Sequence, residues 1–140
     1  MEKLIRLNEF VFLEDLLISQ TATEKGIDNT EINQRIFQNL YWLAEKIIKP
    51  VLKLKSNGII TSCFRCQKLN DLVGWSKTSQ HLKGEAVDMV FTGESLESVF
   101  EFFKNTQLPY DQLILEKNNC LHFSYDRDKK KQRREALTYE

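Results

Sequence analysis

Apolar residues recur at helical spacing through residues 31–55, and this stretch limits the possible folds more than any other part of the sequence. The recurring residues are Ile32, Ile36, Phe37, Leu40, Leu43, Ile47, Ile48, Val51 and Leu52. They would form one side of a long helix, and such an apolar side must be buried against another layer. We expect Thr30 to cap this helix and Pro50 to kink it near Ile47, because proline lacks a backbone donor and clashes with the preceding turn.

Shorter elements are expected after the long helix. The β-branched run at 59–62 and the apolar run at 86–91 predict two strands. Between them lie a short helix at 68–73 and a polar loop at 74–84. A further helical repeat over 96–105 follows the second strand. Helices and strands therefore alternate irregularly along the chain.

The last apolar segments form a predicted hairpin. Residues 112–116 and 120–125 are apolar runs that flank the polar tripeptide 117–119, which suits a hairpin loop. This order of elements predicts an α+β fold with a small antiparallel sheet packed against helices. At 140 residues, the chain is long enough for one domain, which we place at 1–125. Residues 126–140 are mostly charged and are expected to form a solvated or frayed tail.

Charge and cysteine content exclude few functions. Lys plus Arg equals Asp plus Glu at 20 each, so the net charge indicates neither a nucleic-acid partner nor an anionic membrane. The apolar run at 10–13 is interrupted by Glu14 and Asp15, too early for a signal peptide or a membrane span. We therefore expect synthesis in the cytoplasm without a signal peptide. Three cysteines make an odd count, which fits a reducing compartment.

The chain contains two histidines, His81 and His122. His122 lies in the strand expected at 120–125, where side chains alternate between two faces. Its neighbours on the opposite face are Leu121, Phe123 and Tyr125. Because these three residues would pack in the core, we expect His122 to face away from the core and toward a cleft.

Asp88 follows His81 within the same predicted loop and strand. Two imidazoles and one carboxylate, with a fourth position left for water, are the ligand set of a catalytic zinc centre, whereas structural zinc usually has four protein ligands. From spacing alone, the alternative interpretation is that His81, Asp88 and His122 are ordinary surface or hydrogen-bonded residues.

The segment 79–88 reads Ser-Gln-His-Leu-Lys-Gly-Glu-Ala-Val-Asp. It resembles the Ser-x-His-x-x-Gly-x-Ala-x-Asp motif of the zinc D-Ala-D-Ala carboxypeptidases, metallopeptidases that share a fold with the Hedgehog signalling domain. Residues 61–65 resemble the Ser-Gly-Tyr-Arg segment of that family, and 121–125 resemble its closing strand. Residues 14–29 resemble the leader region of phage-type members. The resemblance covers most of the chain.

The resemblance implies that His81, Asp88 and His122 bind one Zn²⁺. It further implies hydrolysis of peptide bonds in bacterial peptidoglycan, with a stem peptide or cross-bridge as the partner. The enzyme would be a carboxypeptidase or endopeptidase, acting as a monomer on the cell wall after release by a phage-type route.

The same resemblance implies substrate contacts. Arg65 matches the family's arginine and would bind a substrate carbonyl or carboxylate, which suits the planar fork of a guanidinium. A surface ion pair is the alternative for Arg65. Ser79 and Gln80 are also expected to contact substrate, although Ser79 could instead cap the loop.

One position departs from the family pattern. The general base commonly lies three residues before the last histidine, and Asn119 occupies that place here. Glu116 is the nearest carboxylate. If 117–119 form a three-residue loop, Glu116 lies opposite Cys120, on the face of His122 and diagonal to it, about 7 to 8 Å away. We therefore predict that Glu116 is the general base, whereas a two-residue loop would turn it away.

Two other function classes remain open at this point. Because of Asn119, the chain could be a catalytically inactive zinc domain that binds a partner or a wall fragment. Cys63 and Cys66 have Cys-x-x-Cys spacing, which is also found in thiol redox proteins. No thioredoxin-like strand-to-helix pattern surrounds them, so we favour two small, partly buried thiols as the explanation. Trp75 and Tyr110 are candidates to line the cleft.

Overall fold

The computed structural model describes residues 4–74 and 76–139. Along the chain, the elements are η1 (Leu13–Leu16), α1 (Gln20–Lys25), α2 (Gln34–Leu43), η2 (Ala44–Ile48), α3 (Lys49–Leu54), β1 (Gly58–Ser62), α4 (Gln67–Val73), η3 (Gln80–Lys83), β2 (Ala86–Phe91), α5 (Leu96–Lys104), β3 (Gln112–Leu115), β4 (Leu121–Ser124) and β5 (Glu135–Thr138). Within the described ranges, no helix has the length and apolar character needed to span a membrane.

The predicted long helix is present as three consecutive helical segments, α2, η2 and α3. Its N-cap is Asn33 rather than the predicted Thr30. The Asn33 side chain accepts a hydrogen bond from the backbone N–H of Ile36 at 2.8 Å. The hydroxyl of Thr30 instead donates a hydrogen bond to the carboxylate of Asp28. The helix therefore begins one turn later than expected, at the first side chain free to cap it.

The distortion expected near Ile47 is a wide π turn over η2. The N–H of Lys49 reaches back to the carbonyl of Ala44, and the side-chain amide of Asn8 donates to the same carbonyl at 3.1 Å. The π turn ends at Ile48, two residues before Pro50, which has no N–H to continue the regular pattern. The proline thus changes the local helical pitch, and the segment continues as α3.

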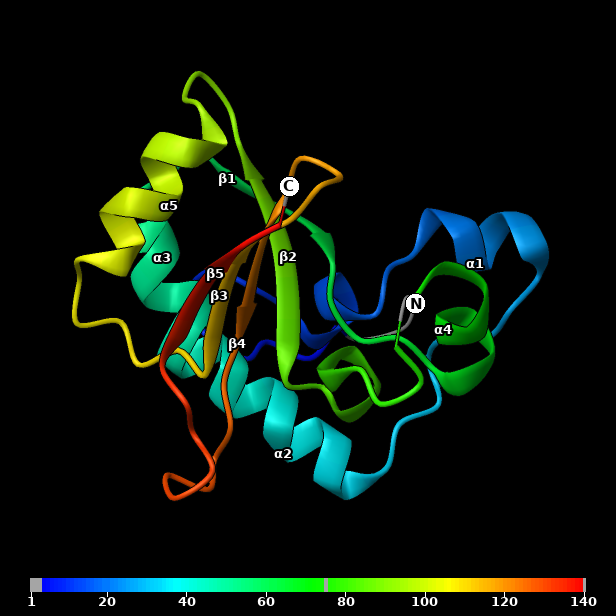
Figure 1. The fold of residues 1–140 in the computed structure, drawn as a ribbon. Coiled ribbons are helices and arrows are strands. Elements are labelled where there is room, and N and C mark those ends of the chain that lie inside the picture. Colours follow the sequence, from blue (N-terminus) through cyan, green and yellow to red (C-terminus); the bar gives the residue numbers. More distant parts are fainter. Residues whose placement is uncertain (1–3, 75, 140) are drawn as a thin grey trace.

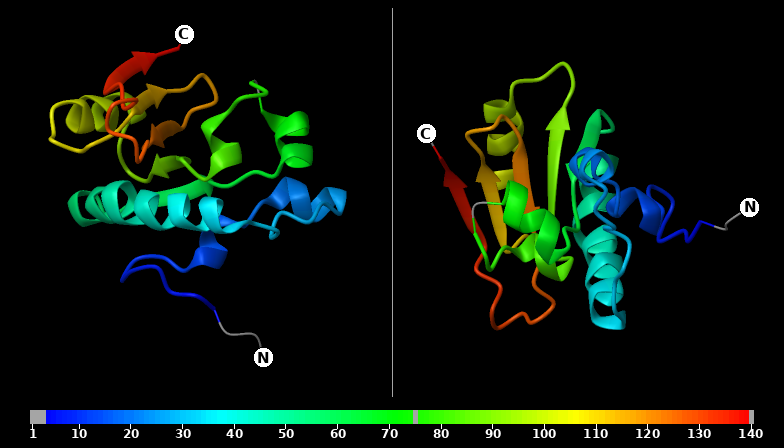
Figure 2. Two further views of the ribbon diagram at one scale, coloured as in Figure 1. Left: turned by 90° about the horizontal axis from the view of Figure 1, so that it is seen from below. Right: turned by 90° about the vertical axis from the view of Figure 1, so that its right-hand side faces the viewer.

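In the part of the chain that the structure describes, five strands form one sheet in the order β1-β2-β4-β3-β5. All neighbouring pairs are antiparallel except β3 and β5, which are parallel. The long helix and α5 cover one face of this sheet, and the N-terminal segment crosses the far side of the long helix (Figures 1 and 2). The predicted α+β class with a mostly antiparallel sheet is confirmed.

The β3–β4 hairpin has the predicted three-residue loop. Leu115 pairs with Leu121, and the N–H of Glu116 donates to the carbonyl of Cys120 at 3.0 Å. Asn119 closes the loop in the left-handed region, at φ 62°, a conformation that asparagine tolerates better than most residues. Glu116 therefore lies opposite Cys120, on the same face as His122.

The expectation of a frayed tail after residue 125 is wrong for its last part, because β5 pairs with β3 along the edge of the sheet. Arg134 stacks on the ring of Tyr110 and donates to the carbonyls of Leu108 and Thr106. The charged residues before β5 remain largely exposed. The charge of this segment led to a wrong expectation for β5, because the partners of the arginines lie far away in the sequence.

Candidate metal centre

Three elements bring the candidate ligands together. His81 comes from η3, Asp88 from β2 and His122 from β4, and Asp88 and His122 face each other as paired residues of adjacent strands. The hydroxyl of Ser79 caps η3 by accepting a hydrogen bond from the N–H of His81 at 3.2 Å. Gly84 ends η3 at φ +73°, and a side chain there would press on the long helix. The motif 79–88 thus encodes a tight turn that returns the chain to β2.

The three side chains form a buried group in which all candidate ligand atoms lie within 4.8 Å of one another. His81 Nε2 lies 3.2 Å from Asp88 Oδ2, and His122 Nδ1 lies 3.0 Å from Asp88 Oδ1. Each residue exposes less than a tenth of its surface: 3% for His81 and 8% for each of the others. The spacing satisfies the geometric requirement for a shared cation.

The tautomer of His81 follows from its second hydrogen bond. Its Nδ1 lies 2.6 Å from the backbone carbonyl oxygen of Cys63, which can only accept, so we infer that Nδ1 carries the proton. Nε2 then presents a lone pair to a carboxylate oxygen of Asp88. Two lone pairs at this distance require a proton or a metal ion between them. Burial lowers the pKa of His81, which disfavours the proton, so the donor set fits a divalent metal.

Asp88 is held in its charged form. Burial raises the pKa of its carboxyl, but the two neighbouring histidines have the larger opposite effect, and the pKa lies well below its usual range. An ionised carboxylate between two imidazoles is the anionic ligand that such a centre requires.

Arg65 lies beside this group, and its ion pair is made with the buried Asp88 rather than with a residue on the surface. Its Nη2 lies 3.3 Å from Asp88 Oδ2, and its other nitrogens donate to Ser62 and Asn70. The backbone N–H of Arg65 also donates to the carbonyl of His81 at 3.1 Å. A guanidinium fixed by two neutral partners places one positive charge beside the candidate metal centre.

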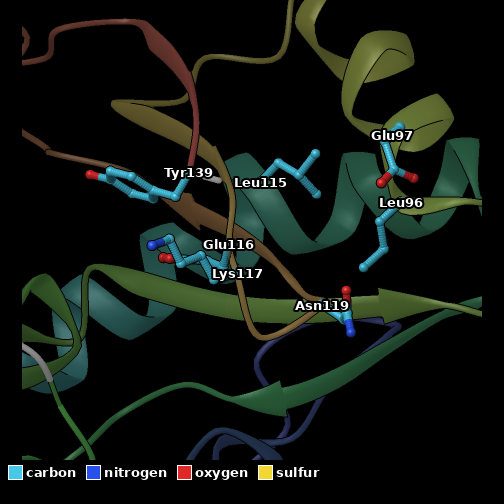
Figure 3. Close-up of a pocket in the computed structure, with 7 residues that line it drawn as sticks. All are labelled: Leu96, Glu97, Leu115, Glu116, Lys117, Asn119 and Tyr139. Carbon is cyan, nitrogen blue, oxygen red and sulfur yellow. The ribbon is translucent and has the colours of Figure 1, made fainter.

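Glu116 lies near the same centre. Burial raises its pKa, and the charges of His122, Asp88 and Arg65 act on it as smaller effects. It also lines an open cavity of about 460 Å³ with Leu96, Glu97, Leu115, Lys117, Asn119 and Tyr139. Figure 3 shows Leu115 and the Glu116–Lys117 pair extending to opposite sides of β3.

Comparison with protein-family models matches residues 8–124 to the model described as peptidase M15. The chain belongs to the peptidase M15 family. Comparisons with curated proteins and with solved structures found no match. The match spans all three candidate ligands, Arg65 and Glu116, and it confirms the resemblance inferred from the motif. The His-Asp-His group is therefore the candidate metal site of an M15 metallopeptidase.

Two further residues expected to contact substrate in this M15 chain have contacts within the protein. Ser79 caps η3, as described above. Gln80 donates through its side-chain amide to Asp111 Oδ2 at 3.0 Å. Their contact with substrate stays a prediction. Sequence reasoning missed Asp111 and Asn70, because their partners Gln80 and Arg65 are separated from them by a turn or by several elements.

The thiols do not resemble a redox centre. All three cysteines are free. Burial strongly raises the pKa of Cys63, so the thiolate that exchange chemistry requires is disfavoured. Tyr110 lies in the core rather than lining a cleft, and Trp75 lies outside the described residues. The Cys-x-x-Cys spacing is accounted for by packing.

Proposed function

We propose that this M15 chain is a zinc-dependent peptidase that hydrolyses peptide bonds in bacterial peptidoglycan. Its substrate would be a stem peptide or cross-bridge, cleaved in the manner of a D-Ala-D-Ala carboxypeptidase or an endopeptidase. A monomer delivered to the wall by a phage-type release route is part of this proposal. The observation that carries it is the buried donor set of His81, Asp88 and His122, in which His81 Nε2 directs a lone pair toward Asp88.

Each neighbouring residue has a proposed task. Bound zinc would polarise the substrate carbonyl and lower the pKa of water. Arg65 would orient a carbonyl or terminal carboxylate of the peptide through its fixed guanidinium. Glu116 would accept the proton of the attacking water. Burial raises the pKa of Glu116, which makes its carboxylate a stronger base near neutral pH.

A second candidate is a catalytically inactive zinc domain that binds a partner or a wall fragment. Asn119 favours it, because an amide cannot take up a proton at neutral pH and it occupies the place where the family commonly has its base. The two candidates share the metal and differ only in turnover.

Metal content and muropeptide digestion test the proposal. One zinc per purified chain, with cleavage that stops on chelation and returns on zinc addition, supports the peptidase. Zinc at full occupancy without cleavage of any wall peptide favours the binding domain. A chain that purifies without zinc and does not take it up rejects both.

Glu116→Gln separates the roles of metal and base. The variant should retain zinc and lose about 10²- to 10⁴-fold in turnover, the usual contribution of a general base. Glu97→Gln is the matched control, because Glu97 lines the same cavity from α5 and has no proposed role. Full activity of Glu116→Gln, with zinc bound, would refute the assignment.

A further inference from the structure

Asp111 is a buried carboxylate that the proposed hydrolysis does not use. It is 1% exposed and immediately precedes β3. Its Oδ1 accepts hydrogen bonds from the backbone N (2.6 Å) and Nε (3.2 Å) of Arg133. Its Oδ2 accepts from Arg133 Nη2 (2.8 Å) and Gln80 Nε2 (3.0 Å). Four donors thus compensate a buried charge that would otherwise be costly to remove from water.

The same residue joins three parts of the chain. Through Gln80 it holds the start of η3, one residue before His81. Its N–H donates to the carbonyl of Ser124 at 2.7 Å, at the end of the strand that carries His122. Its carbonyl accepts from the N–H of Glu135 at 2.9 Å, at the start of β5. Asp111 therefore connects both histidine-bearing elements to the C-terminal segment.

This connection matters because the two histidines come from different elements. β4 is fixed by its neighbours in the sheet, whereas η3 is a single short turn outside it. Metal affinity depends on holding ligands within a fraction of an ångström of the binding geometry. The Cys63 carbonyl restrains the ring of His81, and the Asp111–Gln80 hydrogen bond tethers the preceding residue of η3.

We propose that Arg133 and Asp111 are positioning residues of the metal centre. The chain after β4 folds back so that Arg133 clamps Asp111 and reaches Gln80, and this clamp sets η3 relative to β4. The inference rests on the proposed zinc-dependent function and adds to it a role for the C-terminal segment. Arg133 lies beyond the residues matched to the M15 family, which end at 124.

Arg134 provides a matched control. It is adjacent to Arg133 and also anchors the chain before β5, but its partners are Tyr110 and the carbonyls of Leu108 and Thr106. If Arg133 acted only by docking β5, loss of either guanidinium would have the same effect on zinc. If Arg133 positions His81, only its loss should weaken zinc binding.

The test measures zinc affinity of the full chain by competition with a chromogenic chelator. Arg133→Met should weaken zinc binding about tenfold, as expected for residues that orient ligands from outside the ligand set. Arg133→Lys should restore part of the loss, because an ammonium can still pair with Asp111. Arg134→Met should stay within about twofold of wild type. Gln80→Leu cuts the link at the η3 end, leaves the C-terminal segment anchored, and should match Arg133→Met.

Gln80→Leu also covers the case in which Arg133→Met fails to fold. Unchanged zinc affinity in a folded Arg133→Met or in Gln80→Leu would overturn the inference, as would an equal loss in Arg134→Met. If Arg133→Met and Gln80→Leu bind zinc as tightly as wild type, the clamp is rejected and the proposed function is unaffected. A wild-type chain without zinc affinity would reject both.

Discussion

The two faces of β2 and β4 are buried to nearly the same degree by opposite means. On the face toward the long helix, the four central side chains are fully buried and apolar: Val87, Met89, Leu121 and Phe123. On the other face, Asp88 and His122 are buried among polar partners. Apolar burial stabilises the fold in proportion to area, whereas polar burial is unfavourable unless each group has a partner. Stability therefore comes from one face and chemistry from the other, within the same two strands.

Asp88→Asn should disrupt the polar face and has the largest expected effect on zinc binding and activity. The amide cannot supply an anionic ligand between the two histidines, so zinc binding and wall-peptide cleavage should both fall to background. Because the apolar face is untouched, the metal-free variant should fold with a native near-UV circular dichroism spectrum. Asp71→Asn, at a hydrogen-bonded surface position of α4, is the control and should behave as wild type. Stoichiometric zinc in Asp88→Asn would show that the carboxylate is not a ligand.

Phe123→Ala should break the apolar face instead. Phe123 is fully buried and makes edge contacts with Phe103 and Phe91. Its truncation should lower the free energy of unfolding by about 3 to 5 kcal/mol, measured by urea titration. Phe102→Ala, at a partly exposed ring beside Lys55, should lower it by only about 1 kcal/mol.

The folded fraction of Phe123→Ala should still bind zinc with unchanged affinity. If zinc affinity instead fell together with stability, the two faces would be energetically coupled rather than independent.

The difference between the faces also explains what the sequence could predict. The apolar face was predictable because period-two alternation and helical repeats report directly on burial. The turn from His81 to Asp88 was predictable because serine, glycine and the ligands are close together in one motif. The position of Glu116 followed from the length of a single loop.

Other features of the site depend on contacts between distant segments. Asn33 rather than Thr30 caps the long helix; both residue types are acceptable caps, and Thr30 is already hydrogen-bonded to Asp28. The clamp on Asp111 joins η3, the residue before β3 and the C-terminal segment, and no local pattern indicates that Arg133 will contact Gln80. Charge composition wrongly predicted a frayed tail, because composition carries no information about the specific partners of each charged residue.

Acidification should weaken the polar face selectively. Burial lowers the pKa of His81, so the folded state favours the neutral ring. The contribution of the neutral ring to the free energy of unfolding is complete above about pH 6.5, the pKa of histidine in the unfolded chain. It is lost as the pH falls below that value, with a slope of at most about 1.4 kcal/mol per pH unit. Urea titrations of metal-free protein between pH 7 and 5 would measure the slope.

The pKa of Glu116 is raised by burial, so its protonation adds stability on acidification and opposes the effect of His81. The titrations should therefore use the Glu116→Gln background. In that background, His81→Gln should remove the loss of stability on acidification. A loss of stability on acidification that persists without His81 would assign it to another group.

Thiol reactivity gives the smallest and most local test. Burial, with added repulsion from Asp88 and Glu116, raises the pKa of Cys120 to about 12, and burial raises the pKa of Cys63 as well. Cys66 is only partly buried. Iodoacetamide at pH 8 should therefore modify Cys66 first in the native chain and reach the other two only after urea unfolding, as read by peptide mass spectrometry. If Cys63 of the native chain is labelled as fast as Cys66, or if the two form a disulfide under mild oxidation, their role is not packing alone. That result would support the hypothesis of a thiol redox protein.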